Sequence, residues 1–60
     1  MHVRLYRNKP VIIQENGCER QAVLKQCIIS EKDRELWKVQ LQDKNQEDIQ
    51  WFPLTVPDIQ

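Results

Sequence analysis

The chain has 60 residues, of which 40% are apolar and 30% charged, and its nine basic residues balance its nine acidic ones. This length allows a single domain with a small core, and the branched aliphatic residues spread along it are typical of a folded rather than a disordered chain. A net charge of zero disfavours binding to nucleic acid by phosphate neutralisation, which needs an excess of Lys and Arg.

Turn residues divide the chain into short segments of strand length, which are residues 2–7, 11–14, 18–30, 35–42, 49–52 and 58–60. Pro10 separates the first two segments, because proline lacks the backbone N–H that a central strand donates. Asn16-Gly17 predicts a tight hairpin, since both residues tolerate a positive φ. In the long segment that follows, the alternation of apolar residues slips at Val23 and Leu24, which predicts a β-bulge or a sharp bend.

The second half of the chain alternates more cleanly. Trp37, Val39 and Leu41 share one face of their segment and are predicted to lie in the core. Pro53 and Pro57 bracket the short sequence Leu-Thr-Val, where a single 3₁₀ turn is expected before the last strand.

Five or six strands of this kind form either a meander or a closed barrel. Closure is favoured, because an open sheet of this length would leave its edges exposed and one face uncovered. We therefore expect an all-β fold, a small barrel of five to six mostly antiparallel strands, with residues 1–60 forming one domain.

Residues 35–59, ELWKVQLQDKNQEDIQWFPLTVPDI, resemble the C-terminal half of an SH3-like barrel, in which a polar hairpin, a strand ending in proline, a short 3₁₀ turn and a last small strand follow one another. Residues 18–30, CERQAVLKQCIIS, are similar to the second strand of a Tudor barrel. The resemblance covers about residues 18–59 and implies an SH3-like fold. Leu36 stands where SH3 domains carry the Trp that clamps Pro-rich peptides, and the chain has few aromatics for a Tudor cage. The resemblance therefore implies the fold rather than either family's ligand.

Two neighbouring aromatics suggest a docking surface. Trp51 shares a strand face with Ile49, which predicts a place in the core, whereas Phe52 points to the opposite face with Gln50. Both rings cannot enter one small core, so at least one is expected to be exposed, as aromatic residues at interfaces are. The candidate partner-binding residues are Tyr6, Leu36, Trp51, Phe52 and Pro53.

The N-terminal half suggests an alternative partner. Residues 1–26 carry five basic and two acidic residues, whereas residues 27–60 carry four basic and seven acidic ones. A barrel that resembles the C-terminal domains of retroviral-type integrases, or the KOW modules, would bind nucleic acid through this basic half. The candidate residues for this alternative are Arg4, Arg7, Lys9, Arg20 and Lys25.

Catalysis and metal binding find little support in the sequence. His2 is the only histidine and follows the first Met, so it is a poor candidate for a base or a ligand. Cys18 and Cys27 lack the short spacing of zinc ligands, and Cys27 is expected to pack as a small hydrophobic residue. Two cysteines, without a signal peptide or a long apolar stretch, indicate a reducing cytoplasm.

We therefore predict a non-catalytic protein-interaction module, either a small accessory or regulatory subunit or an adaptor. Its partner is expected to be another protein or complex, with nucleic acid as the second choice and a homo-oligomer left open. No cofactor, metal or membrane is expected to take part.

Overall fold

The computed structural model describes residues 1–43 and 45–59, and within them every regular element is a strand. No helix long and apolar enough to cross a membrane occurs in these residues. The strands are β1 (His2–Arg4), β2 (Pro10–Glu15), β3 (Cys18–Ser30), β4 (Arg34–Leu41), β5 (Glu47–Pro53) and β6 (Thr55–Pro57).

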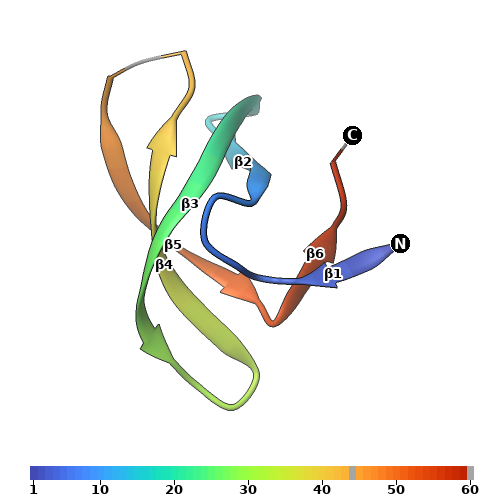
Figure 1. Cartoon of the computed structure of the whole chain (residues 1–60). Coiled ribbons are helices and arrows are strands. Elements are labelled where there is room, and N and C mark those ends of the chain that lie inside the picture. The colour runs from blue at the N-terminus through green and yellow to red at the C-terminus, as the bar shows by residue number, and fades with distance from the viewer. Residues whose placement is uncertain (44, 60) are drawn as a thin grey trace.

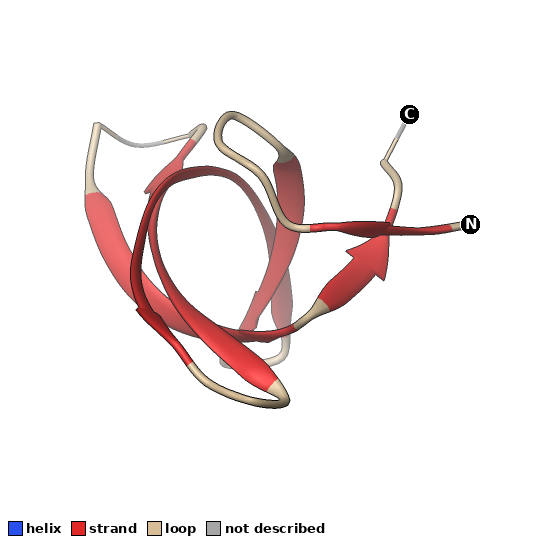
Figure 2. Ribbon diagram, turned by 60° about the horizontal axis from the view of Figure 1, so that its bottom comes forward, coloured by secondary structure: helices blue, strands red, loops and turns tan. Residues whose placement is uncertain are grey.

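The strands form two antiparallel sheets. The larger is a meander in the order β2-β3-β4-β5, and the smaller is a ribbon of β1 paired with β6 (Figure 1). Seen from below, the larger sheet curls round on itself into a half-barrel, and the ribbon stands beside it (Figure 2). The all-β class and the antiparallel pairing expected from the sequence are confirmed.

The core lies on the concave side of the curled sheet. Alternation places every second side chain of each strand on this side, which is why the predicted trio on β4 is buried. Burial of each large aliphatic or aromatic side chain contributes about 1.5–3 kcal/mol. The buried apolar residues are Val11, Ile13, Ala22, Leu24, Trp37, Val39, Leu41 and Phe52.

The turn between β2 and β3 follows the expected chemistry. Asn16 and Gly17 have φ angles of 52° and 78°, the pair of positive values that a type I′ hairpin turn requires. This turn matches the right-handed twist of the strands, and β2 pairs with β3 from Glu15↔Cys18 to Pro10↔Val23. The predicted hairpin is confirmed.

β3 contains two irregularities. Its register against β4 shifts between Leu24 and Gln26 and again between Cys27 and Ile29, which leaves Lys25 and Ile28 as the extra residues. A β-bulge bends its strand and increases the local twist, so one long strand follows the curve of the half-barrel. The irregularity predicted near Val23 and Leu24 is thus found one step further along, and the second one was not predicted.

The structure differs from the sequence predictions near the C-terminus and at one cysteine. A single bend at Leu54 separates β5 from β6 where a 3₁₀ turn was expected, and the last strand is β6 rather than residues 58–60, of which residue 60 lies outside the described part. β6 ends at Pro57, which pairs with His2 of β1. Cys27 is exposed instead of packed in the core, since β2 ends before it and leaves that side of β3 uncovered.

Leu24→Ala tests the core. Leu24 is completely buried, so the substitution is expected to lower the free energy of unfolding by about 2–5 kcal/mol through lost burial and a cavity. Urea denaturation followed by Trp fluorescence measures the change. Ile28→Ala, at an exposed position of the same strand, is the control and should cost less than about 1 kcal/mol; an equal loss in the two variants would contradict the position of the core.

Candidate interaction surface

Two apolar side chains of β5 face solvent. Ile49 and Trp51 are 52% and 40% exposed, whereas Phe52 is 8% exposed and belongs to the core. Asp48 and Gln50, on the same side of β5 as Phe52 by alternation, are only half-buried. The Asp48 carboxylate accepts hydrogen bonds from the Gln50 side-chain amide and from the Ile49 backbone N–H, both at 2.8 Å. The polar groups on the inner side of β5 therefore satisfy one another.

Three apolar residues line up across three strands on the convex side. Leu36 of β4 is the direct partner of Ile29 on β3 and of Trp51 on β5. Direct partners in antiparallel strands project to the same side with Cβ atoms about 4.5–5.5 Å apart. Ile29 is exposed like Trp51, and Leu36 between them is half-buried. We call Ile29, Leu36 and Trp51 the apolar row.

Ion pairs border the apolar row. The Arg34 guanidinium lies 4.0 Å from the centroid of the Trp51 ring, and its Nε donates to the Glu31 carboxylate at 2.7 Å. This hydrogen bond raises the pKa of Arg34. Beside the row, Ile49 pairs with Lys38, whose Nζ lies 3.7 Å from the Glu47 carboxylate. The result is an apolar centre with a charged rim, which is the usual anatomy of a protein–protein interface.

The two neighbouring aromatic rings of β5 face the opposite sides to those predicted from the sequence: Trp51 faces solvent and Phe52 faces the core. At least one exposed ring was expected, and the exposed one is Trp51, whereas Phe52 is 8% exposed and belongs to the core. The reason is register: the inner face of β4 pairs with the even-numbered residues of β5, as in Trp37↔Gln50. Alternation within β5 alone could not identify the inner side.

The other predicted docking residues fall in two places. Pro53 is exposed and pairs with Arg34, so it lies at the end of the apolar row together with Leu36 and Trp51. Tyr6 is exposed in the connection between β1 and β2, outside the three strands that carry the row. Ile29 was missed because only the register places it on the same face as Trp51, and Ile49 was missed because its side of β5 was predicted to face the core.

The basic residues proposed for nucleic acid differ in burial and in pairing. The Lys9 side chain is 0% exposed, and its Nζ lies 3.4 Å from the Asp58 carboxylate and 5.4 Å from the centroid of the Tyr6 ring. Lys9 is therefore part of the fold rather than a phosphate contact, which corrects the prediction. Arg20 lies 3.0 Å from Asp43 and 3.6 Å from Glu15. Of the remaining three, Arg4 and Arg7 are exposed and Lys25 is half-buried.

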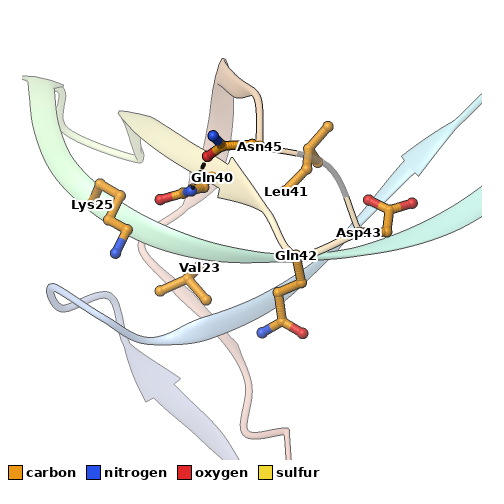
Figure 3. Close-up of a pocket in the computed structure, with 7 residues that line it drawn as sticks. All are labelled: Val23, Lys25, Gln40, Leu41, Gln42, Asp43 and Asn45. Carbon is orange, nitrogen blue, oxygen red and sulfur yellow. Dashed lines mark hydrogen bonds between the residues drawn. The ribbon is translucent and has the colours of Figure 1, made fainter.

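A cavity of about 350 Å³ opens where β3 and β4 meet the β4–β5 turn (Figure 3). Val23 and Lys25 come from β3, and the side-chain amide of Gln40 donates to Asn45 at 3.3 Å across the turn. Lys25 and Asp43 lie at opposite sides of the close-up, and Asp43 is already paired with Arg20. Among the described residues, the lining offers hydrogen-bonding amides and one charge of each sign, and none of these residues is a base next to a nucleophile.

Comparison with protein-family models, with curated proteins and with solved structures gave no match to this chain. Its function is therefore inferred from its own surface. The SH3-like resemblance stays a prediction from the residues that carry it.

Substitutions of Lys9 and Asp58 test the buried lysine. Asp58→Ala leaves the buried ammonium without its carboxylate and is expected to lower the free energy of unfolding by about 1–3 kcal/mol. Lys9→Met keeps much of the volume and removes the buried charge, and the carboxylate of Asp58, which is 46% exposed, remains hydrated. Its cost should therefore be small. Denaturant unfolding measures both, and a larger loss for Lys9→Met than for Asp58→Ala would argue against this account.

Alkylation kinetics test the surroundings of Cys27. Its pKa is raised by desolvation and by the negative charge of Glu35, so less of the reactive thiolate is present at neutral pH. Glu35→Gln is expected to lower this pKa and to speed the reaction with iodoacetamide at pH 7.5. The rates are compared in a Cys18→Ser background, which leaves Cys27 as the single thiol. An unchanged rate would show that Glu35 does not act on Cys27.

Proposed function

We propose that this protein is a non-catalytic interaction module that docks another protein through the apolar row and Ile49. The observation that carries the proposal is the direct alignment of Ile29, Leu36 and Trp51 across three strands on the solvent side of the sheet. A small accessory subunit or adaptor is the role that such a surface suits best.

The composition of the surface supports docking rather than chance exposure. Scattered apolar residues on a surface are ordinary, but an aligned group with a Trp at one end and an Arg stacked on it is not scattered. Trp and Arg are the residues most enriched among those that dominate binding energy. The stacked Arg34 and its bond to Glu31 hold the Trp51 ring before any partner arrives, which lowers the entropy lost on binding.

We further propose that the half-barrel is of the SH3-like type, as the resemblance of residues 18–59 implies. The meander of β2 to β5, the strong bend of β3 and the pairing of the two chain ends support this proposal. Nucleic-acid binding is less well supported, because Lys9 is buried and Arg20 is paired with two carboxylates. A cytoplasmic location is proposed from the two free thiols, Cys18 and Cys27.

A photo-crosslinking residue at position 49 tests the docking surface, with the same residue at position 12 as control. Partners trapped in cells only from position 49 are identified by mass spectrometry, and their affinity for the purified chain is then measured by calorimetry. Trp51→Ala is expected to weaken that affinity at least tenfold, as at other aromatic hot spots that cost about 2 kcal/mol or more.

Ile29→Thr and Ile12→Thr form a matched pair, since both isoleucines are 44% exposed and lie in strands. Ile29→Thr should weaken the affinity for the partner severalfold, because a lost methyl-sized contact costs about 1 kcal/mol where the partner buries it. Ile12→Thr should leave the affinity within about twofold of that of the unmodified chain. If Ile29→Thr and Ile12→Thr weaken the affinity equally, or if neither Ile29→Thr nor Trp51→Ala weakens it, the apolar row is not the docking surface. Sedimentation of the purified chain shows whether the partner is a second copy.

A further inference from the structure

Lys25 also lines a second cavity. It has a volume of about 360 Å³ and is lined by Arg7, Lys25, Gln26, Cys27 and Trp37. We call it the basic cavity. β2 covers β3 only as far as Val23, so beyond that point β3 faces the connection between β1 and β2 instead.

Backbone hydrogen bonds hold that connection in place. The Asn8 N–H donates to the Leu24 carbonyl at 2.8 Å, and the Leu24 N–H donates to the Lys9 carbonyl at 2.9 Å. These two bonds anchor the residue that follows Arg7 against the residue that precedes Lys25. The main chain thereby brings the two cationic residues to one cavity.

The first bulge of β3 sets the direction of Lys25. Lys25 is the extra residue between Leu24, which faces the core, and Gln26, which pairs with Lys38 on the convex side. Bulges commonly re-aim a side chain in this way. Lys25 consequently lies where β2 no longer covers β3, and it lines both this cavity and the first one.

The charges of Arg7 and Lys25 are not neutralised. Lys9, Arg20, Arg34 and Lys38 each have a carboxylate within 4.0 Å. Among residues 1–43 and 45–59, neither Arg7 nor Lys25 has such a partner, and none of the residues that line the basic cavity is acidic. Two like charges that share a concave, partly apolar site concentrate a positive potential there.

We propose that the basic cavity binds an oxyanion, a phosphate or carboxylate group of a small ligand. The Arg7 guanidinium supplies paired donors that match such a group, Lys25 supplies a compact positive charge and the Gln26 side chain a neutral donor. The mostly buried Trp37 forms an apolar wall for the remainder of the ligand. This site is separate from the apolar row and does not depend on the proposed docking.

Glu35 is the acidic group that acts on this region. Its carboxylate accepts hydrogen bonds from the Trp37 indole N–H at 3.2 Å and from the Ser30 hydroxyl at 3.1 Å, and it raises the pKa of Cys27. It does not line the basic cavity. Its negative charge nevertheless opposes an anion there, so Glu35→Gln, which keeps an acceptor for the indole, should strengthen binding.

A small oxyanion fits better than nucleic acid. Binding to a polyanion draws on many phosphate contacts at once, and the basic cavity offers two cations. The adjacent β3–β4 turn and the start of β4 carry Glu31, Asp33 and Glu35, which repel a chain of phosphates. A single phosphate or carboxylate group engages Arg7 and Lys25 without approaching that turn.

Two-dimensional ¹H–¹⁵N NMR titrations test the site, with inorganic phosphate and acetate as probes at constant ionic strength and sodium chloride as the reference salt. Saturable shifts are expected at the Gln26 and Cys27 amides and at the Trp37 indole. Arg7→Gln and Lys25→Gln should each weaken binding about tenfold, the loss typical of one hydrogen bond to a charged group. The controls are Arg4→Gln and Lys32→Gln, which replace exposed cations that do not line the basic cavity. Neither control should change the affinity for phosphate or acetate.

A stronger response to phosphate than to acetate assigns the site to phosphate groups, and the reverse assigns it to carboxylates. Shifts that rise equally with chloride, or that persist in Arg7→Gln and Lys25→Gln, would overturn the proposal. Binding of a 12-base-pair DNA duplex that Arg4→Gln weakens as much as Arg7→Gln would overturn it in favour of a nucleic-acid surface. The titration needs no protein partner, so its result is independent of the outcome for Ile29 and Trp51.

Discussion

The packing of Trp37, Val39 and Leu41 on the concave side of the sheet is the constraint on which the rest of the structure depends. Side chains alternate along a strand, and direct partners in an antiparallel ladder share a face. Because these three residues face the core, the register determines which side of the sheet each residue paired with β4 faces. Ile49 and Trp51 are exposed for this reason, although their own strand contains little that would predict it.

The two bulges of β3 build on that constraint and produce both proposed sites. The second bulge restores Ile29 to the convex side, where it joins Leu36, although strict alternation from Cys27, the partner of Trp37, would turn it inward. The first makes Lys25 the extra residue of the strand, next to the basic cavity. The same irregularities also keep this open stretch of strand from offering a flat edge to other chains. A feature that bends the sheet around a small core thus also shapes its surface.

The chain ends contribute to stability in a way that a 60-residue domain needs, because its core alone is small. β1 and β6 pair with each other, and Lys9 reaches Asp58, which follows β6. A fully buried lysine is tolerated only with a partner for its charge. The contact therefore couples the loop before β2 to the segment after β6, and it removes Lys9 from any surface role.

Much of the fold follows from the sequence by itself, since alternation and the Asn16-Gly17 turn act locally and determined the positions of β2 to β5, the core face of β4 and the hairpin. Which side of β5 faces inward, where β3 bulges a second time, and which cations keep a free charge were decided only by the tertiary structure. Each of these depends on register between strands that lie far apart in the chain. Register is set by packing across the whole sheet, and no single segment contains it.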